Sequence, residues 1–449
     1  MMAPTQKRGG ADETMSSPIF ISAGEASGEH YGALLIEALK KQLAVSGQTA
    51  SFFGMGGERM AAAGLERIVR SEDMAVMGLT EVVLHLPRIY REFRKLKKAI
   101  RARRPSVAVL IDFPEIHFRL AKELHRMGVP VIYFVSPQLW AWKKHRIKLV
   151  QKYIRRMLVI FPFEEPFYRE HGVQAEFVGH PLTELPPPTI SREEFAKASS
   201  LDPTKAWIAL LPGSRPKEIR HNLPNMLEAA WTLSGYPRNP SDRGSNVYAS
   251  RRLGPGAQLP LRRRATDQFE FVVPLAPTLN KAQQIAVLDM VDDHGGGLPI
   301  RVVDDARATL FHARASVVAS GTATVEAALI GNPFIVVYRV SPLTFAIAKR
   351  VVKVDHVAMV NLIAGKRIVP ELIQQDFTVA NVVRQIEVLL PDGPPRESMM
   401  KDLAQIRSKL NSLPSGHGGQ TGAIERVAAI TVKEVRADST AQNQYPVRV

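Results

Sequence analysis

The sequence predicts an α/β protein built from two doubly wound parallel sheets, with further helices towards its C-terminal end. A chain of 449 residues exceeds what a single hydrophobic core supports, so more than one domain is expected. Short apolar runs alternate with helical patterns, and these runs are apolar throughout, as in parallel strands covered by helices on both faces. Four prolines within His180–Pro188 separate one such series from the next, which predicts a domain boundary there.

The predicted elements follow the chain in two series. The first consists of strand Ile19–Ala23, helix Ala33–Leu43, strand Val107–Ile111, helix Glu115–Arg126, and strands Val131–Val135 and Leu158–Phe161. The second contributes strands Trp207–Leu211, Phe269–Leu275, Ile300–Val303, Ser316–Ser320 and Phe334–Val340. The predicted regions are a disordered leader at 1–17, α/β domains at 18–188 and 189–375, a flexible basic insertion at 235–266, C-terminal helices at 376–435 and a disordered tail at 436–449.

The excess of basic residues predicts an anionic partner. There are 59 Lys and Arg against 43 Asp and Glu, a formal net charge of +16. Nucleic acid, a phosphorylated substrate and an anionic membrane would each satisfy this charge. The absence of Cys excludes a disulfide scaffold, a thiolate metal site and a catalytic thiol. No uncharged apolar run approaches the ~20 residues that cross a bilayer, so any membrane contact is expected to be peripheral.

The first predicted strand ends in the motif A-G-E-A-S-G-E-H, which begins at Ala23. The carboxyl ends of parallel strands line the binding crevice of such sheets, so this motif is a candidate ligand site. A plain glycine turn, with Ser27 as helix cap, is an equally good explanation. The spacing is not G-x-G-x-x-G and gives no support for dinucleotide binding. The candidate binding residues are Gly24, Glu25, Ser27 and Gly28.

Three candidate catalytic side chains follow the strand Val107–Ile111. Asp112 stands directly after it, where catalytic groups of α/β sheets are commonly found. Glu115 and His117 follow closely enough to orient Asp112 or to replace it as a base. The alternative is that Asp112 caps the next helix, and the local sequence favours neither explanation.

The strands Trp207–Leu211 and Ser316–Ser320 each lead into a small turn that opens a predicted helix. Backbone N–H groups at such a helix start bind phosphate, and an arginine adds a guanidinium group. A glutamate one turn further in can accept both hydroxyls of a ribose. Two such turns in one domain predict a nucleotide diphosphate site. The candidate residues are Gly213, Ser214 and Arg215 in the first turn and Gly321, Thr322 and Glu326 in the second.

Missing motifs exclude several other sites. There is no G-x-x-x-x-G-K-[ST], which disfavours a P-loop ATPase, no pair of histidines four residues apart, and no D-x-D. The adjacent pairs Asp292–Asp293 and Asp304–Asp305 are more typical of surface turns. Neither a metal nor a cofactor is therefore expected.

An apolar stretch beside basic segments predicts a membrane-docking surface. Residues 74–86 are nearly uncharged, and basic residues are dense in 88–104 and in 143–156, just after Trp140 and Trp142. Such a combination suits an interface with anionic lipid. The alternative is a core segment beside a solvated helix face. No nucleic-acid-binding motif is present, so no nucleic-acid partner is expected. The predicted contact residues are Met74, Val76, Met77, Leu79, Arg88, Arg91, Arg94 and Lys95.

Taken together, the motifs resemble the lipid-A-disaccharide synthase family, glycosyltransferases of the two-domain GT-B type. The matching segments are A-G-E-A-S-G-E at Ala23, V-M-G-L-T-E-V at Val76, I-D-F-P-E at Ile111, Y-F-V-S-P-Q-L-W-A-W at Tyr133, F-P-F-E at Phe161, V-G-H-P at Val178, L-L-P-G-S-R at Leu210, S-G-T-A-T-V-E at Ser320 and N-L-I-A-G at Asn361. They occur in this order over most of the chain.

The resemblance implies two Rossmann-like domains facing a central cleft, the first for the acceptor and the membrane and the second for a UDP-sugar. It implies inverting transfer of 2,3-diacylglucosamine from UDP-2,3-diacylglucosamine to 2,3-diacylglucosamine 1-phosphate (lipid X), without a metal, on the cytoplasmic face of an anionic inner membrane. Asp112 would deprotonate the acceptor, and Arg215 would stabilise the leaving diphosphate. The remaining implied roles are Glu326 for ribose, Asn361 and Gln374 for the donor, and Glu25 and Ser27 for the acceptor.

The chain departs from the family pattern beside the implied base. Where the family motif reads I-D-x-P-D-F-N, this chain has Glu115, Ile116 and His117, which leaves the roles of Glu115 and His117 open. Two alternatives remain: another UDP-sugar enzyme of similar fold, such as a GlcNAc transferase or an epimerase, and a basic binding module without catalysis. A water-soluble acceptor would not require the apolar stretch at 74–86, which favours the lipid substrate.

Overall fold

The structure is a computed structural model. It describes the backbone of residues 17–74, 79–235, 268–295, 297–342, 345, 356–411 and 421–444, and the side chains of these residues except 17, 79–85 and 436–444. The predicted leader and the predicted insertion lie outside this part of the chain except at Ser17 and Gly235. In the predicted tail, residues 436–444 are helical, and 445–449 lie outside the described residues.

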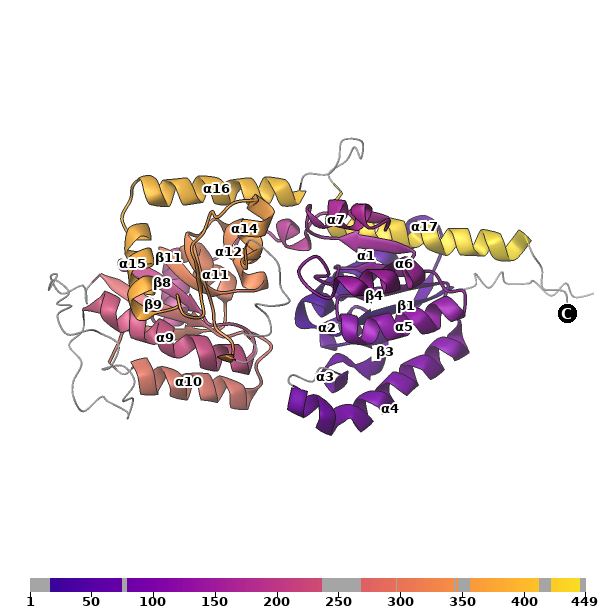
Figure 1. The fold of residues 1–449 in the computed structure, drawn as a ribbon, viewed down its shortest axis with the longest axis horizontal. Helices are drawn as coiled ribbons and strands as arrows, with labels where there is room; N and C mark the ends of the chain where they lie inside the picture. Colours follow the sequence, from indigo (N-terminus) through magenta and orange to yellow (C-terminus); the bar gives the residue numbers. More distant parts are fainter. Residues whose placement is uncertain are drawn as a thin grey trace, which may run out of the picture. The chain divides into compact units, whose positions relative to one another are not determined.

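The chain forms two compact units, residues 1–184 with 413–449 and residues 185–412 (Figure 1). The boundary at Glu184 falls within the proline-rich segment His180–Pro188. The helical region predicted at 376–435 is shared between the two units, because its last helix returns to the first.

The first unit holds a seven-stranded parallel sheet in the order β3-β2-β1-β4-β5-β6-β7. Its strands are β1 Ser17–Ala23, β2 Ala50–Gly56, β3 Leu65–Arg70, β4 Val107–Ile111, β5 Val131–Phe134, β6 Arg156–Val159 and β7 Ala175–Phe177. Its helices are α1 Ala26–Val45, α2 Glu58–Ala62, α3 Ser71–Met74, α4 Leu79–Arg103, α5 Pro114–Arg126, η1 Lys144–Arg146, α6 Ile147–Tyr153, α7 Glu164–Glu170, η2 Pro181–Glu184 and α17 Ala423–Gln444.

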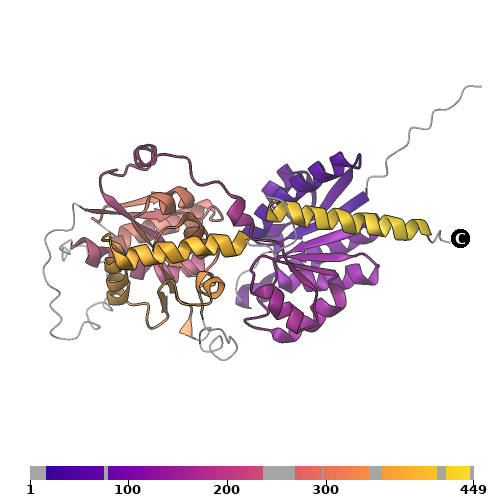
Figure 2. The ribbon, with the colours of Figure 1, turned by 90° about the horizontal axis from the view of Figure 1, so that it is seen from above.

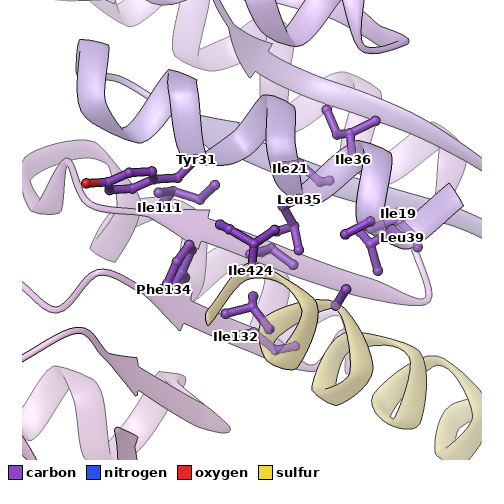
Figure 3. Close-up of a cluster of buried hydrophobic side chains, with 14 of the residues drawn as sticks. Ile19, Ile21, Tyr31, Leu35, Ile36, Leu39, Ile111, Ile132, Phe134 and Ile424 are labelled. Carbon is purple, nitrogen blue, oxygen red and sulfur yellow. The ribbon is translucent and has the colours of Figure 1, made fainter. Parts of the chain in front are cut away.

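Helices cover both faces of this sheet, as its uniformly apolar strands predict. Along β1, Ile19 and Ile21 pack in the core formed with α1 and α17, whereas Phe20 packs in the core of the opposite face. α17 lies along α1 although it comes from the far end of the chain (Figure 2). Figure 3 shows Ile424 of α17 beside Leu35 of α1. The last helix thus completes the core of the first unit.

The second unit repeats this design with a six-stranded parallel sheet in the order β10-β9-β8-β11-β12-β13. Its strands are β8 Ala206–Leu211, β9 Phe269–Pro274, β10 Ile300–Val303, β11 Ala315–Ala319, β12 Phe334–Tyr338 and β13 Glu371–Ile373. Its helices are α8 Arg192–Ser199, α9 Pro216–Ser234, α10 Lys281–Gly295, α11 Ala306–His312, α12 Thr322–Ile330, α14 Met359–Ala364, α15 Val379–Leu389 and α16 Pro394–Asn411. The prediction of two doubly wound parallel sheets is confirmed.

Each sheet has a switch point at which the direction of strand addition reverses. In the first sheet it lies between β1 and β4, and in the second between β8 and β11. Open α/β sheets bind ligands beyond the carboxyl ends of the strands at this point. The four turns identified in the sequence follow β1, β4, β8 and β11, so they stand in two pairs, one at each switch point.

Candidate active site

The loop between β1 and α1 brings Gly24 against the turn that follows β4. A Cβ atom on Gly24 would stand 2.3 Å from the Phe113 ring, so only glycine allows this approach. Glu25 is the extended N-cap of α1, and its side chain is half-buried. Ser27 lies inside α1 and does not cap it, which corrects the expectation from sequence.

Two further residues of this motif, Gly28 and Glu29, lie within α1. Gly28 is buried in α1, and a Cβ there would lie 3.5 Å from the Ile111 carbonyl oxygen, an ordinary contact distance. Glu29 accepts a hydrogen bond from the backbone N–H of Arg59 at 2.8 Å and holds the start of α2. Gly57 makes room for this carboxylate, because a Cβ there would come within 2.3 Å of it. Glu29 therefore braces the loop after β2, a role that the sequence pattern alone does not reveal.

Replacing Gly24 by alanine is expected to disturb the neighbouring turn through the Phe113 ring. We expect Gly24→Ala to lower kcat about tenfold or more, since small displacements of catalytic groups have large effects on rate. The double variant Gly24→Ala with Phe113→Leu should recover part of the loss, because the smaller side chain relieves the overlap. Steady-state kinetics of the three proteins test this; equal activity of Gly24→Ala and the wild type would contradict it.

Asp112 and Phe113 form a strained turn between β4 and α5. Both have a φ of 52°, in a left-handed region that costs a non-glycine residue about 1–3 kcal/mol. The Asp112 carbonyl accepts hydrogen bonds from the Tyr133 hydroxyl at 2.6 Å and from His117 Nδ1 at 2.5 Å. The Asp112 N–H donates to the Phe134 carbonyl at 3.0 Å. Because α5 has Phe113 as its N-cap, Asp112 does not cap it, and its half-buried side chain stands at the switch point.

His117 belongs to the support of this turn. Its side chain is fully buried, and this burial lowers the pKa of His117 to about 4, while the hydrogen bond to the Asp112 carbonyl acts in the opposite direction. The ring is therefore neutral at pH 7. Since a carbonyl only accepts, Nδ1 carries the hydrogen and Nε2 accepts from the Ser22 hydroxyl at 2.8 Å. Of the two roles expected for His117, this geometry fits the orientation of Asp112 and not its replacement as the base.

Glu115 is exposed and paired with two cations. Its carboxylate lies 3.4 Å from Lys143 Nζ and 3.3 Å from Arg146 Nη1, and its side chain is 54% exposed. Both cations come from the segment after β5, so Glu115 ties α5 to that segment. Exposed pairs of this kind contribute only about 0.2–1 kcal/mol each. The geometry thus favours a role in holding the segment over one in proton transfer.

In the second unit, the turn after β8 presents the start of a long helix. Gly213 has a φ of 122°, which favours glycine, and Arg215 is the N-cap of α9. The Ser214 N–H donates to Glu218 at 3.3 Å, and Arg215 Nη1 lies 3.7 Å from the same carboxylate. A carboxylate therefore occupies the helix start, where phosphates also bind. Glu218 was not predicted as a site residue, although an acidic residue in the first turn of a helix is itself a signal for such an anion site.

The turn after β11 adjoins this one, because β8 and β11 are hydrogen-bonded neighbours. Gly321 is the N-cap of α12, and both Gly321 and Thr322 are exposed. Burial raises the pKa of Glu326, and Arg307, whose Nη1 lies 3.3 Å away, opposes this rise. Among the described residues, no group of three or more His, Asp or Glu side chains is arranged to hold a metal ion.

Asn361 is fully buried and its amide is engaged by the loop that enters β13. Oδ1 accepts from the N–H groups of Ile368 and Val369 at 2.8 and 3.0 Å. Nδ2 donates to the Val369 carbonyl at 3.0 Å and to Glu371 at 2.7 Å. Asn361 therefore shapes this loop, and its assignment to the donor site stays a prediction.

Gln374 follows β13 with a φ of 51° and stands at the carboxyl edge of the sheet. Its N–H donates to the Tyr338 carbonyl at 2.9 Å, and its Nε2 donates to the Val340 carbonyl at 3.1 Å. The Gln374 carbonyl in turn accepts from Arg339 at 3.3 Å. Gln374 thus joins the ends of β12 and β13, and its assignment to the donor site stays a prediction.

The loss of the Asn361 amide should destabilise the second unit. Asn361→Ala leaves buried N–H and C=O groups without partners, and we expect a loss of about 2–4 kcal/mol in the free energy of unfolding. Urea unfolding followed by circular dichroism measures this loss. An unchanged stability together with a raised donor KM would instead indicate direct donor contact.

The predicted membrane-contact residues divide into three groups. Val76 and Met77, with the side chain of Leu79, lie outside the described residues. Met74 is 2% exposed and packs in the core of the first unit, so it does not face lipid. No helix among the described residues is long and apolar enough to cross a membrane. The predicted contact residues Arg88, Arg91, Arg94 and Lys95 are exposed on α4. Arg88 pairs with Asp73, and Arg91 and Lys95 pair with Glu92.

Comparison with solved structures defines the class of fold. A glycotransferase of kitacinnamycin gives a TM-score of 0.56 at 14% identity over 94% of this chain and 99% of that chain. The calicheamicin glycosyltransferase gives a TM-score of 0.52 at 17% identity, over 94% of this chain and 99% of that chain. A putative UDP-N-acetylglucosamine 2-epimerase from Listeria monocytogenes gives a TM-score of 0.54 at 14% identity, over 94% of this chain and 97% of that chain. The protein therefore has the GT-B fold, which these structures share whether they are named as transferases or as an epimerase.

Sequence comparison selects the family within this class. The model of the lipid-A-disaccharide synthetase family matches residues 19–241 and 256–415. The lipid-A-disaccharide synthase of Acidobacterium capsulatum is 58% identical over 88% of this chain and 92% of its own length. The lipid-A-disaccharide synthase of Koribacter versatilis is 47% identical over 93% of this chain and 99% of its own length. The chain belongs to the lipid-A-disaccharide synthase family and is a UDP-sugar-dependent glycosyltransferase, not an epimerase or a non-catalytic binding module.

Proposed function

We propose that the protein transfers 2,3-diacylglucosamine from UDP-2,3-diacylglucosamine to O6 of 2,3-diacylglucosamine 1-phosphate. The products are the β-1,6-linked disaccharide 1-phosphate and UDP. The observation that carries this proposal is the strained Asp112 turn, fixed at the switch point of the first unit of a chain in this family. Strain of this kind persists where the surrounding structure holds a functional group in place.

Asp112 acts as the general base in this proposal. Its carboxylate accepts the proton of the acceptor 6-hydroxyl, and the oxygen attacks the anomeric carbon of the donor as the bond to the UDP oxygen breaks. Attack opposite the leaving group inverts the anomeric configuration. His117 and Tyr133 both donate to the Asp112 carbonyl, which keeps the side chain aimed as the proton moves. Glu25 and Ser27, half-buried beside this turn, face the acceptor.

The diphosphate of the donor binds at the paired turns of the second unit. Arg215 and the N–H groups of Gly213, Ser214, Gly321 and Thr322 stabilise the negative charge that UDP gains as it leaves. Glu326 accepts the ribose hydroxyls, and Gln374 completes the donor side. The support for this assignment is the pairing of two helix starts at one switch point.

The protein works as a peripheral protein on the cytoplasmic face of an anionic inner membrane, where both lipid substrates reside. The exposed basic residues of α4 support this assignment, together with Tyr90 of the same helix, which is 63% exposed. Lys and Arg attract anionic headgroups, and an aromatic ring inserts at the interface. Vesicle co-sedimentation tests it: charge reversal at Arg91 and Arg94 should reduce binding to anionic vesicles and leave the absence of binding to neutral vesicles unchanged.

UDP release measures the proposed reaction directly. Purified protein with UDP-2,3-diacylglucosamine should release UDP at a rate that depends on added 2,3-diacylglucosamine 1-phosphate. UDP-N-acetylglucosamine with the same acceptor serves as the control for the acyl groups. Folded protein that releases no UDP in the presence of both lipid substrates would refute the proposal.

A further inference from the structure

The segment after β5 is held in a strained conformation next to the Asp112 turn. We call residues Val135–Lys143 the β5 loop. Val135 has a φ of 63° and Lys143 a φ of 55°, and a β-branched residue such as Val135 rarely adopts this region. Together with Asp112 and Phe113, they place four strained residues in two segments at one edge of the sheet. Strained residues persist only where the surrounding contacts over-determine them.

The β5 loop is tied to the Asp112 turn near both of its ends. Just before it, Tyr133 donates to the Asp112 carbonyl, and the Phe134 carbonyl accepts from the Asp112 N–H. At its far end, Lys143 reaches Glu115 in the first turn of α5. A change in the conformation of the loop is therefore transmitted to the turn that carries the proposed base.

A buried carboxyl group holds the middle of the loop. Glu164, the first residue of α7, is 1% exposed. Its Oε1 accepts from Trp140 Nε1 at 3.3 Å, its Oε2 accepts from the Phe161 N–H at 3.2 Å, and the Ser136 hydroxyl is a further partner. Ser136 also bonds to the buried Tyr168 hydroxyl at 2.8 Å. Glu164 thus connects two residues of the β5 loop to the loop after β6.

The surroundings of Glu164 keep its carboxyl protonated. Burial raises the pKa of Glu164 to about 8, against the hydrogen bonds that favour the carboxylate. Its partners are an indole, backbone N–H groups and a hydroxyl, and none of these carries a positive charge. The pKa of Tyr168 is itself raised by burial, so this neighbour stays neutral. In its protonated form the carboxyl joins these partners without placing a charge among them.

Two other titratable groups lie close by but face elsewhere. His180 contacts Glu164's neighbour Phe161, with ring centroids 5.3 Å apart, and burial lowers the pKa of His180 to about 3, so it is neutral as well. Glu165 turns away, because it pairs with Arg169 at 2.5 Å and accepts from the Phe177 N–H at 3.1 Å. Ionisation of Glu164 would therefore place an uncompensated charge beneath the β5 loop.

We infer that Glu164 is a positioning residue of the transferase: as a neutral acid it holds the β5 loop in the strained conformation that keeps Asp112 in place. This inference rests on the proposed function of Asp112. Glu164 touches neither substrate and transfers no proton to one. Its loss of a proton at alkaline pH is expected to loosen the loop and with it the aim of the base.

The test compares the pH dependence of kcat in the wild type, Glu164→Gln and Glu164→Ala. Glutamine keeps a carbonyl oxygen that can accept from Trp140 and does not ionise, but its amide nitrogen cannot accept from the Phe161 N–H. In the wild type, the fraction of molecules with a neutral Glu164 falls about tenfold per pH unit above pH 8. We expect Glu164→Gln to retain wild-type kcat at pH 7 within about threefold and to lose less activity at pH 9 than the wild type. Glu164→Ala should lose about tenfold or more at all pH values. Glu165→Gln, on the same helix, should leave the wild-type profile unchanged.

A second measurement does not depend on activity. A carboxyl whose pKa is higher in the folded state than in the unfolded state stabilises the fold at low pH and loses this contribution as the pH rises to about 8. The melting temperature of Glu164→Gln relative to the wild type should therefore rise between pH 5 and pH 9. If the wild type released no UDP, the proposed function would fail. The difference in melting temperature would still report the protonation state of Glu164.

Three results would overturn the inference. One is an identical alkaline limb in the wild type and Glu164→Gln. Another is full activity of Glu164→Ala, which would show that the loop needs no such support. The third is a near-complete loss of kcat in a folded Glu164→Gln, which would place the carboxyl in the chemistry itself.

Discussion

Asp112→Asn is expected to lower kcat about 10³-fold or more and to leave the KM of both substrates within a few-fold of the wild type. General bases contribute about 10²–10⁴-fold to enzymatic rates, and an amide cannot accept the proton of the acceptor hydroxyl at neutral pH. Asparagine tolerates the left-handed backbone that Asp112 adopts, so the turn should persist. Initial rates of UDP release, with a thermal melt to confirm folding, measure the effect.

Glu115→Gln is the matched control for this variant. Glu115 lies three residues further on, but it is exposed and paired with Lys143 and Arg146. Because exposed ion pairs contribute little, we expect less than about threefold loss of kcat. The reverse outcome, a nearly active Asp112→Asn and an inactive Glu115→Gln, would assign the base to Glu115.

Some strands could be predicted from the sequence because both of their faces are covered. β4 has the same bounds, Val107–Ile111, in prediction and structure, since each of its residues is buried. β3 was not predicted, because its sequence L-E-R-I-V-R mixes buried with exposed residues at the edge of the sheet. The start of α1 was placed too late because Gly28 and Gly32 indicate a turn. In the structure both glycines lie within α1, and Gly32 allows close packing, because a Cβ there would come within 2.7 Å of the Met60 sulfur.

The candidate site was accessible from sequence only in part, for a related reason. The turn that follows a parallel strand is placed at the carboxyl edge by the strand itself, so the turns that hold Asp112 and Arg215 could be located without tertiary information. The role of a side chain depends instead on partners far away in the chain. His117 meets Ser22 across 95 residues, and no local pattern reveals that contact. Asn361, similarly, is bonded by a loop whose path the sequence does not specify.

Arg215→Ala is expected to produce the second largest loss, and at the donor site. A hydrogen bond to a charged group contributes about 1.5–3 kcal/mol, so we expect the KM for the UDP-sugar to rise about 10- to 100-fold. The KM for the acceptor should change little. The donor KM of Arg215→Lys should lie between those of the wild type and Arg215→Ala, because lysine keeps the charge but not the planar pair of donors. Initial rates with each substrate varied in turn distinguish donor from acceptor effects.

Glu218 supplies the opposite control at the same helix start. Its carboxylate receives the Ser214 N–H and lies beside Arg215, so it competes with the diphosphate for these donors. Charges near a helix start contribute about 0.3–1 kcal/mol, and Glu218→Gln should therefore lower the donor KM about 2- to 5-fold. UDP should inhibit this variant at correspondingly lower concentration. If Arg215→Ala and Glu218→Gln both raised the donor KM, Glu218 would be a support for Arg215 and not a competitor of the diphosphate. A donor KM that rises in Arg215→Ala and falls in Glu218→Gln would place the diphosphate at the start of α9.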